Sequence, residues 1–408
     1  MAVSIAPIPA RTPITNTGDL CSTTWIRWLS QELMGTLETN LTTVQITGAA
    51  GLCQGRLTLA SGYPVYGPVA MTPSSTDTGT EIVTFATAHG WKNGTIVTPL
   101  TTGGNLTQGT RYYINAPSTT TASFHTTVAA AMAGTSKVDL TASITSVIKP
   151  SGISATTLYY APYKGSIVTL FDGSSWVLSQ FTEISIALGT LTSDLPYDVF
   201  IYLVGSTLTL ELVAWTSTFV RAAELVMRDG IKVKDSTGMK RYVGTICTDS
   251  TTTTIDDAGG LIGSNVGGIR YVYNEYNQIE RQMFVVEITT WTYATATWRA
   301  ARGSTANRVK FVAGSQDGLA KAFVRAVHNI NANGDAAVGV GLNVTDANHA
   351  LLFMQGTLAT QYVNQLAEFQ DYVPPGANYL QWVENSLETK TLNFSSGVNC
   401  GMVANWLC

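Results

Sequence analysis

The stretch YDVFIYLVGSTLTLELVAW, residues 197–215, predicts the fold class of this chain. Apolar and polar side chains alternate on both sides of Gly205-Ser206, as they do in a strand with one buried face. A glycine beside a small polar residue between two such runs is typical of a hairpin turn. We therefore expect two antiparallel strands here. Similar turns are predicted at Lys164-Gly165, Asp172-Gly173 and Asp229-Gly230.

The same pattern of alternating runs and turn residues covers most of the 408 residues, and it predicts a mainly β chain with several domains. We expect an N-terminal arm plus a short helix over 1–46, for attachment to a larger particle. A middle β domain would comprise 47–76 and 150–262, interrupted by a small inserted β module at 77–149. Residues 263–408 predict an antiparallel C-terminal sandwich of jelly-roll type.

Three segments depart from the strand pattern. Residues 251–268 are rich in Thr and Gly and predict a loop or linker, with Asp256 and Asp257 in solvent. Residues 358–376 have some helical spacing and predict a short helix or a loop. Residues 128–134, VAAAMAG, predict a short Ala-rich turn or helix.

The predicted N-terminal helix carries its large apolar residues on one side. Trp25, Trp28, Leu29 and Leu33 recur at helical spacing. A short helix with two Trp residues is not stable alone in water, so it must dock on another surface. Either it caps the next domain of its own chain, or the arm and helix anchor the protein to a larger assembly.

The composition narrows the function classes. Only 12% of residues are charged and the formal net charge is −4, so no basic patch for nucleic acid is expected. No apolar run reaches about 18 residues, and the N-terminus has no secretory pattern, so no membrane insertion is expected. A surface with so little charge suits either self-association or an extracellular, particle-borne β protein.

Few motifs for catalysis or metal binding are present. The five cysteines form no CxxC pair or zinc spacing, and we expect free thiols, with a Cys400–Cys408 bridge as the alternative. His89 lies in the turn AHGW and is expected to serve that turn. No P-loop, HExxH, GxGxxG or GxSxG motif occurs, so we expect neither cofactor nor metal and no enzyme.

Carbohydrate chemistry defines the remaining alternatives. A polysaccharide-cleaving spike would need two carboxylates about 5 to 10 Å apart. Candidate acids are Glu183, Asp194, Asp198, Glu211, Asp256, Asp257, Glu368 and Asp371. Sugar binding without cleavage would use aromatic faces, for which Trp291, Tyr379 and Trp382 are the candidates. Aromatic residues of this kind are more often part of a core.

Several long stretches resemble tail-fibre and other virion structural proteins of tailed bacteriophages. They are RLTLASGYPV (56–65), the run from ATTLYYAPYKG to VAWTS (155–217), the run from RAAELVMRDGIKVK to TDSTTTT (221–254), RYVYNEYNQIERQM (270–283) and TWTYATATWRAARGSTANRVKFVAG (290–314). A second resemblance is to a small β module found in phage tail and fibre proteins, carried by AHGWKNGTIVTPL (88–100), GTRYYINAPSTTTASFHTT (109–127) and AAMAGTSKVDLT (130–141).

The resemblance implies a virion protein made in the host cytoplasm, a tail fibre or appendage subunit that takes part in host attachment. It implies a homotrimer whose Trp25, Trp28, Leu29 and Leu33 face tail or connector proteins. The distal domains would contact a host-surface glycan or protein. A capsid decoration protein or head fibre, and a polysaccharide-degrading tailspike, remain as alternatives.

Overall fold

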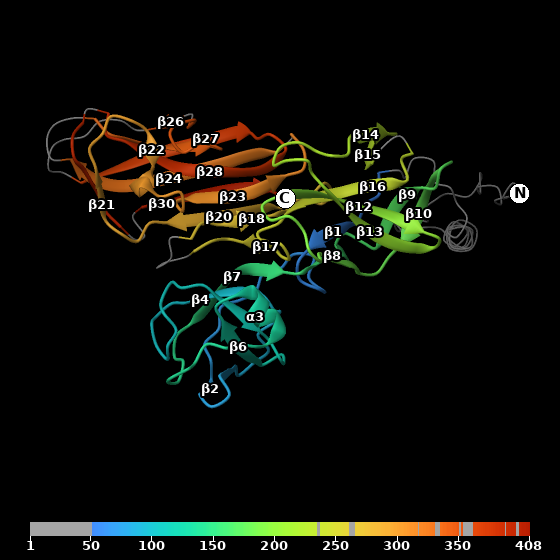
Figure 1. Cartoon of the computed structure of the whole chain (residues 1–408), viewed down its shortest axis with the longest axis horizontal. Coiled ribbons are helices and arrows are strands. Elements are labelled where there is room, and N and C mark those ends of the chain that lie inside the picture. The colour runs from blue at the N-terminus through green and yellow to red at the C-terminus, as the bar shows by residue number, and fades with distance from the viewer. Residues whose placement is uncertain are drawn as a thin grey trace, which may run out of the picture.

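The computed structural model is mainly β, with several antiparallel sheets, as the sequence predicts (Figure 1). A middle β domain and a C-terminal sandwich lie end to end, and a smaller module stands beside their junction. The structure describes residues 51–234, 237–260, 266–316, 318–330, 335–350, 352–353, 362–387, 389–396 and 400–408.

The middle domain has one apolar core between several short sheets. Leu57, Leu158, Val199 and Ile246 are buried together in it. Its strands are β1 (Gly55–Thr58), β8 (Thr157–Pro162), β9 (Ile167–Phe171), β10 (Trp176–Gln180), β11 (Ile184–Ala187), β12 (Pro196–Val204), β13 (Thr207–Ala214), β14 (Leu225–Arg228), β15 (Ile231–Lys234), β16 (Lys240–Cys247) and β19 (Val272–Asn274).

Three of the four predicted hairpin turns are confirmed. β12 and β13 pair up to Val204 and Thr207, so Gly205-Ser206 is a two-residue turn, and Gly205 has φ 62°. The turns at Asp172-Gly173 and Asp229-Gly230 connect the strands of the β9–β10 and β14–β15 hairpins. The prediction at Lys164-Gly165 is wrong, because β8 and β9 do not pair. Here the chain crosses between sheets, and the Lys164 N–H donates to the Gln54 carbonyl.

The inserted module has a separate small core around Phe85, Trp91 and Phe124. Its elements are β2 (Ser75–Asp77), β3 (Ile82–Thr84), β4 (Thr95–Pro99), β5 (Tyr112–Asn115), β6 (Thr121–His125), α3 (Val128–Ala133) and the first half of β7 (Ile148–Ala155). The predicted short helix is α3. The Thr127 hydroxyl caps its N-terminus, and Gly134 ends it in the left-handed conformation.

Strand β7 connects the module to the rest of the protein. Its first residues pair with β4 of the module, and Gly152 onward pairs with β17 (Thr254–Asp257). β17 continues through β18 (Ile269–Arg270) into the C-terminal sandwich. The linker prediction for 251–268 is therefore wrong at 254–257. These residues form an internal strand, because one of its edges pairs with β7, which is distant in sequence, and the other pairs with β18.

The C-terminal domain is a sandwich whose two sheets enclose Phe311, Trp382, Met402 and Trp406. One sheet contains β20 (Glu280–Val286), β21 (Trp291–Tyr293), β24 (Leu319–Ile330), β26 (Leu352–Phe353), β27 (Val363–Tyr372), β29 (Leu392–Phe394) and β30 (Gly401–Leu407). The other contains β18, β22 (Arg299–Ala300), β23 (Arg308–Ala313), β25 (Ala337–Leu342) and β28 (Gly376–Asn385). A short 3-10 turn, Ala301–Gly303, follows β22.

The helix-or-loop prediction for 358–376 is wrong over 363–372, which form β27. Gln365, Ala367 and Phe369 are buried, whereas Asn364, Glu368 and Gln370, which alternate with them, are exposed. This is a period of two, and pairing of β27 with β24 along ten residue pairs fixes it.

The described cysteines Cys53, Cys247, Cys400 and Cys408 are buried free thiols, as predicted, and Cys21 lies outside the described ranges. Cys400 and Cys408 cannot form the alternative bridge, because they flank opposite ends of extended β30. No helix in the described part of the chain is long and apolar enough to span a membrane. The described residues also contain no cluster of three or more His, Cys, Asp or Glu side chains that could hold a metal ion.

Candidate functional site

The residues predicted for particle attachment, Trp25, Trp28, Leu29 and Leu33, lie outside the described residues. Of the three predicted glycan contacts, two are in the core. Trp382 is fully buried, and Trp291 is 9% exposed. The Trp291 ring stacks on Phe394 at 4.5 Å between ring centroids, and its indole N–H donates to Glu384 at 2.6 Å. Neither indole is open to a sugar in this structure, because both fill the space between the two sheets.

Tyr379, the third predicted glycan contact, is half-buried on β28. The Arg308 guanidinium covers one face of its ring at 4.7 Å from the centroid. The predicted aromatic residues therefore do not form a common platform.

The candidate carboxylates are dispersed, and several are engaged in ion pairs. Asp198 pairs with Arg221 at 2.7 Å, and Glu211 pairs with Lys234 and Lys240. Asp256 and Asp257, expected in solvent, pair with arginines instead; Asp257 is fully buried against Arg111.

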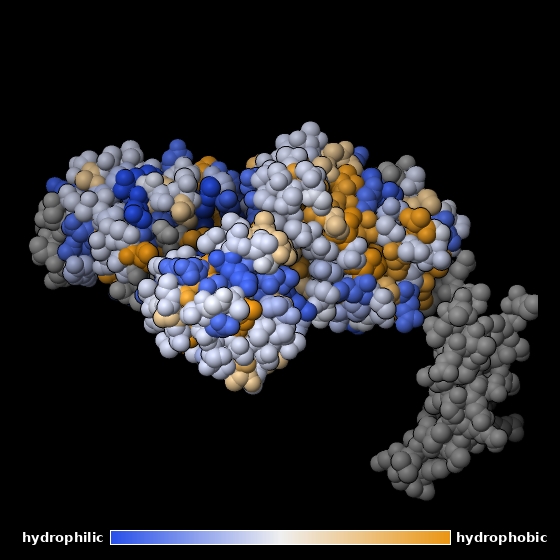
Figure 2. Space-filling view, turned by 60° about the horizontal axis from the view of Figure 1, so that its bottom comes forward, coloured by the Kyte–Doolittle hydropathy of each residue, from blue (hydrophilic) through white to orange (hydrophobic). Residues whose placement is uncertain are grey.

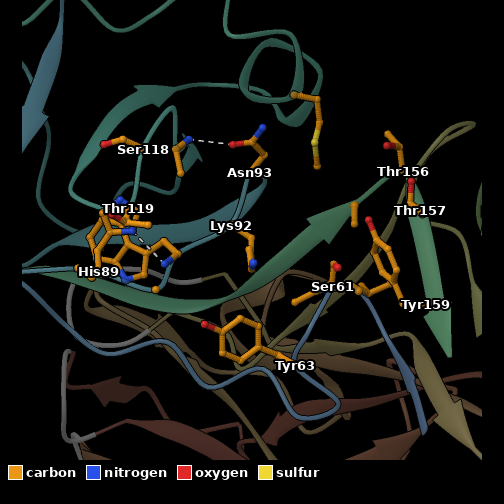
Figure 3. A pocket seen from close by; sticks show the side chains of 18 residues that line it. Ser61, Tyr63, His89, Lys92, Asn93, Ser118, Thr119, Thr156, Thr157 and Tyr159 are labelled. Atoms are coloured by element: carbon orange, nitrogen blue, oxygen red, sulfur yellow. Dashed lines mark hydrogen bonds between the residues drawn. The ribbon is translucent and has the colours of Figure 1, made fainter. Parts of the chain in front are cut away.

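A groove of about 640 Å³ lies where the inserted module meets the middle domain (Figure 3). The module contributes the loop 88–93 before β4 and the loop 116–119 after β5. The middle domain contributes residues 59–63 after β1 and residues 155–159 along β7 and β8. The volume lies in the range of roughly 300–1,000 Å³ that is usual for small-ligand sites.

The module wall of the groove is fixed by hydrogen bonds around His89. Its Nδ1 accepts the Trp91 backbone N–H at 2.9 Å, so Nε2 carries the proton and donates to the Thr121 carbonyl at 3.2 Å. Burial lowers the pKa of His89, which keeps the ring neutral at pH 7. His89 thus organises its turn, as predicted. The Asn93 side-chain oxygen holds the second module loop by accepting the Ala116 N–H at 2.8 Å.

The wall formed by the middle domain is anchored by Glu183. Its carboxylate accepts the Ser61 hydroxyl at 2.5 Å and the Gly62 N–H at 2.7 Å. The next residue, Tyr63, is 39% exposed and presents its ring at the groove. Tyr159 on β8 adds a half-buried ring on the same side.

Tyr66 joins the two walls. Its hydroxyl lies 2.5 Å from the Thr95 hydroxyl and accepts the Lys92 backbone N–H at 3.1 Å, so a middle-domain side chain binds two module residues. Burial raises the pKa of Tyr66 to about 12, so the hydroxyl stays protonated at neutral pH. The module segment that carries Lys92 is therefore tied to the middle domain.

The exposed groups in the groove are hydroxyls, an amide, tyrosine rings and one ammonium. Asn93, Ser118 and Thr119 are exposed on the module side, and Thr156 and Thr157 are half-buried on the other. Such a mixture can stack on the apolar face of a sugar ring and hydrogen-bond its hydroxyls. The sequence did not indicate this site, because its four segments are each unremarkable and meet only in the fold.

No protein family model matches the chain, and no curated protein matches it. Among solved structures, BuGH86 in complex with neoagarooctaose aligns with TM-score 0.18 and 10% identity, over 62% of this chain and 33% of that one. An insecticidal delta-endotoxin from Bacillus thuringiensis gives 0.19 and 6%, over 64% and 50%. Infectious bursal disease virus, Gx strain, gives 0.15 and 11%, over 88% and 80%. The chain thus spans about a third to a half of the first two, and TM-scores this low carry no argument.

Proposed function

We propose that this chain is a structural subunit of a tailed-phage particle, a tail fibre or related appendage, that binds a host-surface carbohydrate. The observation that carries the proposal is the groove between the inserted module and the middle domain. The phage-like sequence stretches at 56–65, 88–100, 109–127 and 155–217 contribute most of the groove lining, so the resembling segments and the candidate site coincide.

The chemistry of the groove favours binding over cleavage. Its described lining offers hydroxyls, Asn93 and tyrosine rings, and it includes no Asp or Glu. Hydrolysis of a glycosidic bond normally uses a carboxylate pair. Weak binding at one groove is sufficient for adhesion if several copies act together, since linked sites gain avidity from their high effective concentration.

The shape of the molecule is compatible with this role. Figure 2 shows the module as a lobe against the side of the elongated body, with a largely polar surface. In an anchored particle protein of this shape, the module and its groove would project outward while the elongated body contacts neighbouring copies.

The proposal is tested on particles released from cells that carry the gene. Gold-labelled antibody against the purified chain should bind at the tail tip or fibres in electron micrographs. Labelling over the head would indicate a decoration protein or head fibre, and no labelling would refute a virion role. Light scattering on the purified chain should give about 131 kDa, three copies of 43.5 kDa.

A further inference from the structure

One charged side chain distinguishes the groove from a neutral sugar site. Lys92 projects between the two walls, and its Nζ lies 5.1 Å from the centroid of the Tyr63 ring (Figure 3). It is the only charged residue among the described residues that line the groove, given that His89 is neutral.

No carboxylate of the described residues neutralises the Lys92 ammonium. It forms no ion pair within the described chain. The carboxylate of Glu183, which anchors the 59–63 wall, accepts hydrogen bonds from Ser61 and Gly62. The backbone N–H of Lys92 is bound to Tyr66 and Thr95, so the base of this side chain is fixed while its charged end is left for a ligand.

We propose that the groove binds an acidic saccharide, one that carries a carboxylate or a phosphate ester. The anionic group would accept hydrogen bonds from Lys92, and the neighbouring sugar ring would stack on Tyr63. Hydroxyls along the ligand would face Asn93, Thr156 and Thr157. The inference rests on the proposed function, because it names the ligand class of the same groove.

The proximity of Lys92 to Tyr63 strengthens this assignment. An ammonium near an aromatic face is held there by the ring quadrupole, which pre-positions the charge before a ligand arrives. The partly buried location also reduces screening by salt compared with a fully exposed lysine. A charge-assisted hydrogen bond formed here should therefore contribute measurably to affinity.

The test is calorimetric titration of the full chain with three probes: trigalacturonic acid, its carboxyl-reduced neutral counterpart, and a phosphorylated mannose oligosaccharide. The two acidic probes distinguish carboxylate from phosphate recognition. We expect an acidic probe to bind at least about tenfold more tightly than the neutral one. Lys92→Gln should remove about that factor, and Lys92→Arg should retain most of the affinity.

Lys321→Gln is the matched control, because Lys321 is an exposed lysine of β24 far from the groove and its loss should not change binding. Tyr63→Ala should weaken every probe that binds, whereas Tyr63→Phe, which keeps the ring, should not. Circular dichroism and melting of each variant show that the fold is retained.

Two results would overturn the inference. Equal binding of the acidic and neutral probes would contradict the inference that the ligand is anionic, but it would still support carbohydrate binding. Failure of both acidic probes to bind would reject the acidic-saccharide site. The particle-labelling experiment is independent of both, so the failure of the ligand class and the failure of the virion role can be distinguished.

Discussion

Substitution of Asp256 by Asn tests the ion-pair cluster at the junction of the module, the middle domain and the sandwich. Asp256 lies on β17, between β7 and β18. Its carboxylate binds Arg270 at 2.7 Å and Arg281 at 3.1 Å. The Arg270 side chain is only 5% exposed, so after the substitution its charge would remain buried without a carboxylate.

The expected loss of unfolding free energy is about 3 kcal/mol. Removing one partner of a buried ion pair costs about 3–5 kcal/mol, because the other charge stays desolvated. We expect the lower end of that range, since Asp256 keeps 15% exposure and Asn still offers one acceptor oxygen. Both arginines are affected, yet Arg281 at 16% exposure regains water more easily.

The same cluster has a defined pH dependence. Burial raises the pKa of Asp256, but Arg281 and Arg270 outweigh it, so the pKa lies below its ordinary value. A carboxyl with a depressed pKa stabilises the fold above its unfolded pKa of about 3.9 and loses that contribution as the pH falls through the folded pKa. The wild-type chain should therefore approach the variant in stability below about pH 4.

The assay is urea unfolding of the full chain at pH 7 and at several lower pH values, followed by tryptophan fluorescence. Asp371→Asn is the control, because Asp371 is exposed on β27 and its loss should cost no more than about 0.5 kcal/mol. A double-mutant cycle with Arg270→Met isolates the pair itself. If Asp256→Asn behaved like the control at pH 7, the reasoning would be refuted.

Three further perturbations have defined signs. Burial lowers the pKa of His328, so wild-type stability should fall as the pH drops below about 6.5, and His328→Phe should reduce that acid sensitivity in thermal melts from pH 7 to 5. Burial raises the pKa of Glu384 to about 7, although the hydrogen bond from Trp291 and the charge of Arg299 lower it. Protonated Glu384 therefore contributes stability that is fully present below about pH 4.3 and is lost as the pH rises to 7. Glu384→Gln should remove this slope, worth on the order of 3 kcal/mol; an unchanged slope in urea titrations would contradict the assignment. A Cβ at Gly152 would lie 2.2 Å from the Asp256 carbonyl oxygen, so Gly152→Val should separate β7 from β17 and cost about 3 kcal/mol or more, with faster proteolysis of the module as the readout.

Local chemistry was enough for much of the fold. The alternation in 197–215 and the Asp-Gly pairs predict hairpins because a two-residue turn and its flanking strands interact within a few residues. Thr127 and Gly134 likewise define α3, since caps act within one turn. The aromatic candidates could not be assigned in this way. A buried Trp such as Trp382 and an exposed, sugar-binding Trp are the same residue type with similar sequence neighbours, and only packing against a second sheet distinguishes them.

The sequence by itself determined that the chain is mainly β, where several of its turns lie and that its cysteines have no metal spacing. Tertiary structure decided which segments became internal strands. Residues 254–257 and 363–372 are extended because β7 and β24, distant in the chain, supply their hydrogen-bond partners. Tertiary structure also created the groove, because it brings two folding units together so that they line one cavity with Tyr63, Lys92, Ser118 and Thr157. Long-range pairing sets these positions, and no local propensity encodes it.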